Sequence, residues 1–388
     1  MVLSLECGNI LRLFQVKLLI ICGILSGSIY SLKISTCETN KKYDGFGGFM
    51  TKIKVAINGM GRIGRTVLRE YFARAENEKL FEIVAVNNPG KASEYVHLLK
   101  YDSVHGKFQG DVQLDNDLLT INGQKIKFYN QKDPKEIPWG DLGVQVVIDS
   151  TGVFKDKEGL SKHLHSTVKK VIMCAPGKGL DATFVMGIND HTYNKDVHHV
   201  VSNASCTTNC LAPVAKVLHE KFGIENGFMT TIHSYTSDQM LLDGSHSDPR
   251  RARAAALSMV PTTTGAAKTV GEVIPELKGK LDGYAVRVPT PNVSLTDFTA
   301  NLKTPVSKEA INAALKEASE TYLKGILKFE SEELVSVDFM GMRHSSCVDA
   351  ALTNVIGQNV KVVAWYDNEA GFSNRVLDLV QLMSSKGL

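Results

Sequence analysis

The fold of this chain is decided by residues 53–64, which read IKVAINGMGRIG. A β-rich run, residues 53–58, leads directly into the motif Gly59-x-Gly61-x-x-Gly64, and a helical stretch follows. In such a unit the first glycine permits a tight turn, the second lets the backbone approach a pyrophosphate, and the third lets the helix pack on the strand. The motif alone is a weak signal, but both flanking elements are those it requires. The stretch predicts a dinucleotide-binding domain.

Strands and helices alternate beyond this unit. A helical run, residues 158–166, separates the last two of four further strand candidates, which are residues 81–86, 126–129, 144–149 and 170–173. This alternation predicts a parallel, doubly wound sheet, and a dinucleotide lies across the carboxyl ends of such strands. Cys174 follows the last of these strands, so we expect it to form part of the cofactor wall rather than to act as a nucleophile.

Asn88 follows the second strand, where an acidic residue would normally bind the ribose 2′-hydroxyl of NAD. A neutral amide does not repel a 2′-phosphate, so this position leaves NADP open. The alternative is that the asparagine binds the 2′-hydroxyl and nothing else changes.

Composition excludes several classes of protein. The chain has 388 residues, 43% hydrophobic and 22% charged, which suits two globular domains. Its net charge of +3 is too small to indicate nucleic-acid binding. Seven scattered cysteines indicate free thiols rather than a disulfide framework, and no Cys/His spacing fits a metal site.

The first 50 residues differ from the body of the chain. Basic residues precede a short apolar run, residues 18–25, and small residues follow, as in a secretory signal. Three interpretations remain open: a cleaved signal before a plastid-type targeting segment, a signal anchor, or sequence upstream of a true start at Met50. The segment is excluded from the expected fold.

A second motif, residues 202–213 (SNASCTTNCLAP), follows a β-branched run and precedes a helix expected over residues 211–222. Cys206 is thus expected where a strand passes into a helix. Backbone N–H groups and the helix dipole at such a position lower a thiol pKa and can stabilise an oxyanion. The alternative is a buried cysteine in a polar turn.

The remaining chain predicts an α+β domain with a mostly antiparallel sheet. A strand expected over residues 229–236 carries His233, which on its own is more often structural than catalytic. A helix expected to begin within residues 261–268 offers hydroxyls and free N–H groups to an anion. The other elements are strands at residues 285–288, 293–302, 336–339 and 360–366 and helices at residues 308–323 and 372–383.

Together these stretches identify a family resemblance. The glycine motif, residues 202–213, HSYT at 233–236, RRARAAA at 250–256, PTTTGAAK at 261–268 and WYDNE at 365–369 resemble phosphorylating glyceraldehyde-3-phosphate dehydrogenase over nearly all of the chain from Met50 onward. The resemblance implies a Rossmann NAD(P)-binding domain at residues 51–203 and a catalytic domain at 204–368. A C-terminal helix, residues 369–388, is expected to return to the Rossmann domain.

The resemblance also implies the site. Cys206 would be the nucleophile, forming a hemithioacetal and then a thioester, and His233 its base. Two phosphate sites would be formed by Thr236 with Arg287, and by a second group comprising Ser205, Thr207, Arg251, Thr264 and Gly265. The cofactor would be bound by Gly59, Gly61, Arg62, Ile63, Gly64, Asn88, Lys132, Thr151, Gly152, Cys174, Gly244, Ser245 and Asn368. No metal is expected.

Two features depart from the NAD-specific pattern of the family, and they concern the cofactor. One is Asn88, and the other is Gly244-Ser245 in the loop 237–248, which resembles the NADP-using plastid branch. We therefore expect NAD or NADP as cofactor.

The expected substrates are glyceraldehyde 3-phosphate and inorganic phosphate, and the expected assembly is a homotetramer in which the loop 237–248 reaches a neighbour's cofactor. The mature enzyme is expected in the cytoplasm, alternatively in a plastid, with no membrane or nucleic-acid partner. Erythrose-4-phosphate dehydrogenase shares most of these motifs, whereas aspartate-semialdehyde dehydrogenase lacks the Cys206 string. A non-catalytic surface or RNA-binding protein that reuses the fold is the alternative from another class.

Overall fold

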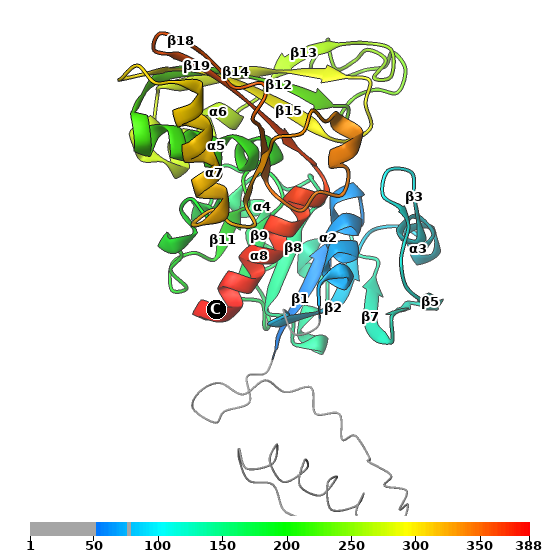
Figure 1. Cartoon of the computed structure of the whole chain (residues 1–388). Helices are drawn as coiled ribbons and strands as arrows, with labels where there is room; N and C mark the ends of the chain where they lie inside the picture. Colours follow the sequence, from blue (N-terminus) through cyan, green and yellow to red (C-terminus); the bar gives the residue numbers. More distant parts are fainter. Residues whose placement is uncertain (1–51, 76–78) are drawn as a thin grey trace, which may run out of the picture. The chain divides into compact units, whose positions relative to one another are not determined.

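The computed structural model describes residues 52–75 and 79–388, which belong to one compact unit (Figure 1). The N-terminal segment discussed above lies outside the described residues. The described part is built on two large sheets, each with its own helices and its own hydrophobic core.

The first sheet has nine strands in the order β10-β11-β9-β8-β1-β2-β7-β6-β5. From β10 to β7 every neighbouring pair is parallel, and only the β7-β6-β5 edge is antiparallel. This confirms the predicted doubly wound α/β domain. Its strands are β1 (Ile53–Asn58), β2 (Phe81–Asn87), β5 (Val112–Asp115), β6 (Leu118–Ile121), β7 (Gln124–Tyr129), β8 (Val146–Asp149), β9 (Lys170–Met173), β10 (Ala182–Thr183) and β11 (Val200–Ser202). Its helices are α2 (Arg62–Ala73), α3 (Ala92–Lys100) and α4 (Lys157–Ser161), and the short pair β3 (Tyr101–Asp102) and β4 (Gly106–Lys107) follows α3.

The second sheet runs in the order β13-β14-β12-β15-β19-β17-β16, with β18 paired to β19. Only β12 with β14 and β16 with β17 are parallel, so the prediction of a mostly antiparallel second sheet is also confirmed. Its strands are β12 (Ile224–Ser234), β13 (Val260–Thr263), β14 (Leu281–Val288), β15 (Ser294–Leu302), β16 (Leu327–Glu330), β17 (Ser346–Asp349), β18 (Asn354–Ile356) and β19 (Asn359–Tyr366). The helices α5 (Cys206–Phe222), α6 (Ala266–Val273) and α7 (Lys308–Glu320) accompany it.

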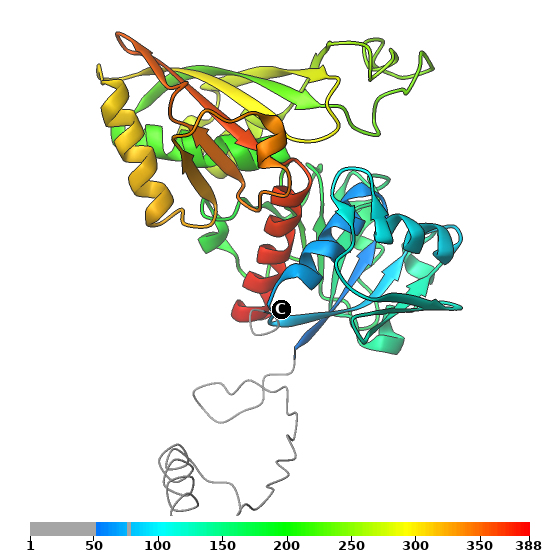
Figure 2. The same ribbon diagram turned by 45° about the vertical axis from the view of Figure 1, so that its right-hand side comes forward.

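The last helix, α8 (Ala370–Lys386), belongs to the core of the first sheet although it follows the second sheet in the chain. Its buried side chains, among them Val376, Leu379 and Val380, share one hydrophobic cluster with Val55 and Ile57 of β1. Figures 1 and 2 show α8 lying alongside α2, the helix that follows the glycine turn. The C-terminus therefore supports the domain that begins the described chain.

A fully buried polar network fixes the carboxyl ends of the central strands. Asn58 at the end of β1 donates to Asp149 at the end of β8 (2.8 Å), and Asn87 at the end of β2 donates to Asn58 (2.8 Å). Asp149 also accepts from the backbone N–H and hydroxyl of Thr151. Because buried polar groups are costly when unpaired, this network fixes the strand ends where a dinucleotide would lie.

Two helix starts expected from the sequence were wrong. Helix α5 begins at Cys206, not at residue 211, because Ser205 caps it by accepting from the N–H of Thr208. Helix α6 begins only at Ala266, because the preceding residues extend as β13 and pair with β14.

Two other elements also differ. Helix α4 ends at Ser161, five residues earlier than expected, and residues 336–339 form a 3-10 helix instead of a strand. In that turn the Asp338 side chain accepts from the backbone N–H of Val335, which favours a compact turn over extended chain.

The packing of α8 predicts that truncating Leu379 to alanine will destabilise the protein. Leu379 is fully buried, so Leu379→Ala should lower the free energy of unfolding by about 2–5 kcal/mol. Chemical denaturation measures this, with the exposed Ser385→Ala in the same helix as control. Equal stability of the two variants would contradict a core role for α8.

Candidate active site

The turn that joins β11 to α5 places Cys206 at the first position of the helix. Ala204 adopts a left-handed backbone with φ of 59°, which is uncommon for a residue other than glycine, and its N–H donates to the Ser202 hydroxyl (2.9 Å). The next residue, Ser205, caps α5. Cys206 is therefore at the positive end of a 17-residue helix, as the sequence predicted.

His233, near the end of β12, faces this cysteine. Its Nε2 atom lies 3.5 Å from the Cys206 Sγ, and its Nδ1 atom lies 2.7 Å from the carbonyl oxygen of Ser234. Two groups approach Nδ1: the Ser234 carbonyl, which can only accept, and the Arg287 Nη1 group at 3.2 Å, which can only donate. The shorter contact to the carbonyl favours the proton on Nδ1, so Nε2 presents its lone pair to the sulfur. The Tyr366 ring packs edge-on against the imidazole, with centroids 5.9 Å apart. The backbone thus holds His233 in the tautomer that a base for Cys206 requires.

Burial shifts the pKa values of both members of the pair. It lowers the pKa of His233 to about 3, with the Arg287 charge adding to the effect. It also raises the pKa of the Cys206 thiol, although Arg287 and the hydrogen bonds of Thr207 act against it. Burial therefore opposes the lowering of this pKa that is expected from the helix N-terminus. A lone charge on either partner is disfavoured, so the two groups titrate as a coupled pair.

Arg287 comes from β14, where it is the cross-strand partner of His233. Its Nη1 group donates to the Thr236 hydroxyl and to the Ser234 carbonyl, both at 3.2 Å. Its Nε is buried and lacks a hydrogen-bond partner among the described residues. A guanidinium with an unused buried donor beside a threonine hydroxyl suits a phosphate oxygen. The structure therefore brings together the predicted pair Arg287 and Thr236.

The residues predicted for the second phosphate site lie around two helix N-termini. Thr208 in the first turn of α5 donates to the backbone oxygen of Ala266, the first residue of α6, so the two helix starts are adjacent. Gly265 caps α6 without a side chain, and a Cβ there would meet no atom within 4 Å. Adjacent helix starts with open space above them favour an anion.

The hydroxyls of this second group are already bonded within the chain. The Ser205 hydroxyl caps α5, the Thr264 hydroxyl accepts from the N–H of Ala266, and the Thr207 hydroxyl lies 2.9 Å from the Tyr366 hydroxyl. Tyr366 in turn lies 2.8 Å from the Thr231 hydroxyl. These hydroxyls position the turn as well as offering oxygen atoms to a ligand.

Arg251, the guanidinium of the second group, is bound by a residue that the sequence did not single out. It forms an ion pair with Asp238 and donates to the hydroxyl of Thr262 (2.8 Å). Asp238 lies in the polar loop that follows β12, where an acidic residue gives no local signal of a role. An anionic ligand at Arg251 would compete with the Asp238 carboxylate.

The glycine turn fits a dinucleotide. A Cβ on Gly64 would lie 1.9 Å from the Gly59 oxygen, so only glycine allows α2 to pack this closely on the turn. A Cβ on Gly61 would meet nothing within 4 Å, which leaves open space beside the first turn of α2. That helix begins at Arg62 with no side-chain cap and no acidic residue in its first turn. Its backbone donors, including that of Ile63, suit a pyrophosphate.

The Arg62 side chain points to carboxylates rather than to this space. It donates to Asp102 (2.7 Å) and pairs with Glu369, the residue that precedes α8. His105 also contacts Glu369 (2.9 Å). Burial alone would raise the pKa of Glu369, but the contacts with Arg62 and His105 lower it. Arg62 therefore links the glycine turn to the start of α8 and leaves only its backbone for a cofactor.

The other predicted cofactor residues follow the carboxyl ends of adjacent parallel strands. Thr151 and Gly152 follow β8, Cys174 follows β9, and the exposed Lys132 follows β7. Burial raises the pKa of the Cys174 thiol, which agrees with a wall position rather than a nucleophile. These residues share one edge of the sheet.

Asn88 also lies at this edge, and both ends of its amide are bonded within the chain. Its Oδ1 accepts from the N–H of Met60 (2.8 Å), and its Nδ2 donates to the oxygen of Pro89 (2.9 Å). Gly244 and Ser245 are on the exposed loop between β12 and β13, where the Gly244 N–H donates to Ala252. In the described part of the chain no hydrogen bond joins these two loop residues to Asn88 or to the glycine turn.

Asn368 follows β19 and lies at the boundary between the two sheets. Its Oδ1 accepts from the hydroxyl of Ser294 (2.9 Å), and it is 7% exposed. The sequence predicted Asn368 through the WYDNE stretch but gave no sign of its serine partner.

Comparison with known proteins decides the family. The model of the glyceraldehyde 3-phosphate dehydrogenase NAD binding domain matches residues 53–157, and that of the C-terminal domain matches residues 205–368. The chain is 56% identical to glyceraldehyde-3-phosphate dehydrogenase of Geobacillus stearothermophilus over 337 residues, 87% of this chain and 99% of the relative. It is 55% identical to glyceraldehyde-3-phosphate dehydrogenase 2 of Trichormus variabilis over 86% of this chain and 99% of that relative. The chain belongs to the glyceraldehyde-3-phosphate dehydrogenase family.

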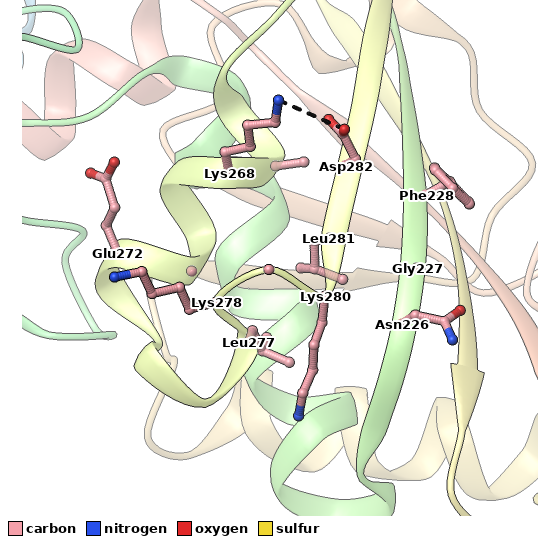
Figure 3. A pocket seen from close by; sticks show the side chains of 13 residues that line it. Asn226, Gly227, Phe228, Lys268, Glu272, Leu277, Lys278, Lys280, Leu281 and Asp282 are labelled. Atoms are coloured by element: carbon pink, nitrogen blue, oxygen red, sulfur yellow. Dashed lines mark ion pairs between the residues drawn. The ribbon is translucent and has the colours of Figure 1, made fainter.

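One cavity of this family member lies away from the residues around Cys206. It has a volume of about 680 Å³ and is lined by residues of α6, β12 and β14, including Lys268, Phe228 and Asp282. Figure 3 shows Lys268 and Asp282 turned toward each other as an ion pair (3.7 Å). Positive and negative side chains are mixed around it, so it lacks the converging anion donors found beside His233.

The described residues contain no helix that is long and apolar enough to cross a membrane, and no group of three His, Cys, Asp or Glu side chains arranged to hold a metal ion.

The geometry of the Cys206–His233 pair predicts how fast the Cys206 thiol reacts when His233 is replaced. His233→Asn should slow alkylation of Cys206 by iodoacetamide about tenfold or more at pH 7, because the pKa of the half-buried thiol is raised and without its histidine partner it carries little thiolate. In this variant the rate should keep rising as the pH is raised toward the pKa of the thiol. Mass spectrometry of the Cys206 peptide measures it, with the buried Cys210 as internal control. Equal rates at pH 7 for variant and unaltered protein would contradict the pairing.

Proposed function

We propose that this chain catalyses the phosphorylating oxidation of glyceraldehyde 3-phosphate to 1,3-bisphosphoglycerate, with hydride transfer to NAD or NADP. The observation that carries the proposal is the Cys206–His233 pair at 3.5 Å, with Arg287 beside it and two helix starts opposite. The names of the relatives support it. We infer that residues 51–203 act as the cofactor domain and residues 204–368 as the catalytic domain.

In the first half of the reaction Cys206 attacks the aldehyde carbon. His233 Nε2 accepts the thiol proton, and that proton passes to the aldehyde oxygen, which gives a hemithioacetal on Sγ. His233 then accepts the hydroxyl proton while the hydride leaves the same carbon, and a thioester remains on Cys206. The nicotinamide ring of the bound cofactor supplies the hydride acceptor.

In the second half inorganic phosphate attacks the thioester carbon. The carbon–sulfur bond breaks, the thiolate returns to Cys206, and the acyl phosphate leaves. Thr236 with Arg287 would hold one phosphate and the group at the two helix starts with Arg251 the other. A thioester donates its acyl group more readily than an oxygen ester, which explains a sulfur nucleophile.

Two alternatives receive less support. Erythrose 4-phosphate would be handled by the same chemistry, but the relatives reported above are named for glyceraldehyde 3-phosphate. A non-catalytic binding protein has no need for a histidine tautomer fixed by a backbone carbonyl at the thiol.

We also infer that the chain assembles with copies of itself, as a homotetramer. Large apolar side chains are exposed on the second sheet and on the loop after β12, among them Phe228 (71%), Leu241 (80%) and Leu257 (82%). Such surface is typical of a subunit interface. Sedimentation equilibrium at micromolar concentration should give four times the chain mass, and a monomer would contradict this inference.

The activity itself is tested by following reduced cofactor from glyceraldehyde 3-phosphate, phosphate and either NAD or NADP, using chain that begins at Met50. We expect turnover with NAD, and with NADP at more than about one hundredth of that rate, a barrier difference under about 2.7 kcal/mol. Cys206→Ser should lose nearly all turnover with both. No activity with either cofactor would contradict the proposed function.

The cofactor proposal is tested at Asn88. Asn88→Asp places a carboxylate near the 2′-phosphate of NADP, so the ratio of kcat/KM for NADP to that for NAD should fall about tenfold or more. An unchanged ratio would show that Asn88 does not face the 2′ position.

A further inference from the structure

Ser294, the first residue of β15, lies between the base and the predicted nicotinamide site. Its hydroxyl oxygen is 3.1 Å from the backbone N of Ser234, the residue whose carbonyl fixes His233. The same hydroxyl is 2.9 Å from Oδ1 of Asn368. Ser294 and Ser234 are 1% and 0% exposed, so water does not substitute for these contacts.

The direction of each hydrogen bond is fixed by chemistry. The N–H of Ser234 can only donate, so the Ser294 oxygen accepts there. The Ser294 O–H therefore needs an acceptor elsewhere, and Asn368 Oδ1 is placed to accept it. If the Asn368 amide were turned over, its NH₂ would face Ser294 and the buried O–H would lose this acceptor.

The backbone around Ser294 leaves it little freedom. The preceding residue, Val293, has a φ of 68°, which is a genuine outlier for a β-branched side chain, and its carbonyl accepts from the Ser234 hydroxyl (2.7 Å). Ser294 also pairs with Tyr366 across β15 and β19. Ser294 and its neighbour Val293 are therefore both hydrogen-bonded to Ser234, the residue that follows His233.

We propose that Ser294 is a positioning residue which sets the orientation of the Asn368 amide, so that Nδ2 and not Oδ1 faces the cofactor. This rests on the proposed function, in which Asn368 binds the nicotinamide carboxamide. An NH₂ group donates to a carbonyl oxygen, so Asn368 would bind the nicotinamide carboxamide through its C=O group. The same hydroxyl fixes the backbone that sets the His233 tautomer, and thus couples the position of the base to that of the hydride acceptor.

The test measures binding rather than turnover. Calorimetry should show that unaltered protein binds NAD and its 3-acetylpyridine analogue, which keeps the C=O but lacks the amide N–H, with Kd values within about threefold. An analogue that binds more than about tenfold more weakly would show that Oδ1 faces the cofactor, and would overturn the proposal.

Variants of Ser294 test the cause. Ser294→Ala should weaken NAD about tenfold and leave ADP-ribose, which lacks the nicotinamide, unchanged, whereas Ser294→Thr keeps the hydroxyl and should bind NAD normally. Thr296→Val removes another buried hydroxyl of β15, one that donates to Ala364, and should change neither ligand.

Two outcomes of this comparison overturn the proposal. In one, NAD binding is unchanged in Ser294→Ala, and in the other NAD and ADP-ribose weaken together, as for a general structural effect. Unaltered protein that binds no NAD would contradict the proposed function itself, and so the two failures are distinguishable.

Discussion

The structure depends on the turn between β11 and α5. A left-handed Ala204 costs about 1–2 kcal/mol, which the bonds of Ser202 and the Ser205 cap offset, and it turns the chain so that Cys206 becomes the first helical residue. β11 belongs to the dinucleotide sheet, whereas α5 packs under the second sheet. Cys206, the predicted nucleophile, is thus placed where the chain passes from the first sheet to the helices of the second, within reach of β12.

The other site groups converge on that point from strand ends. β12 and β14 are parallel neighbours, so His233 and Arg287 are cross-strand partners, and β15 and β19 bring Ser294 beside Asn368. The parallel strands of the first sheet end at Asn58, Asn87 and Asp149, which hydrogen-bond to one another beneath the glycine turn. A helix start and a strand therefore position the predicted nucleophile and base, whereas most predicted cofactor contacts follow strand ends and Gly244 and Ser245 lie on a loop.

Much of this was predictable because it depends on local patterns. The glycine motif predicted the first domain, since only glycine fits at Gly64, and strands with few helices between them beyond Cys206 predicted the mostly antiparallel second sheet. Boundaries that depend on pairing were not predictable: Pro261 was assigned to a helix start, but β14 draws it into a strand.

The partners of the site residues were even less predictable. Three of these contacts join residues far apart in the chain: Asp238 with Arg251 (13 positions), Glu369 with Arg62 (307) and Ser294 with Asn368 (74). The identity of a single residue gives no sign of such a contact. The burial that raises the pKa of Cys206, against the effect of the helix N-terminus, was not predictable for a related reason. The sequence indicates the helix start, whereas burial depends on the packed fold.

The proposed reaction requires that Cys206 becomes acylated between its two halves. Mass spectrometry of protein mixed with glyceraldehyde 3-phosphate and NAD, without inorganic phosphate, measures this acylation. We expect one phosphoglyceroyl group on the Cys206 peptide, which disappears when inorganic phosphate is added. Steady oxidation of the aldehyde with Cys206 unmodified, or an adduct that phosphate does not remove, would contradict it.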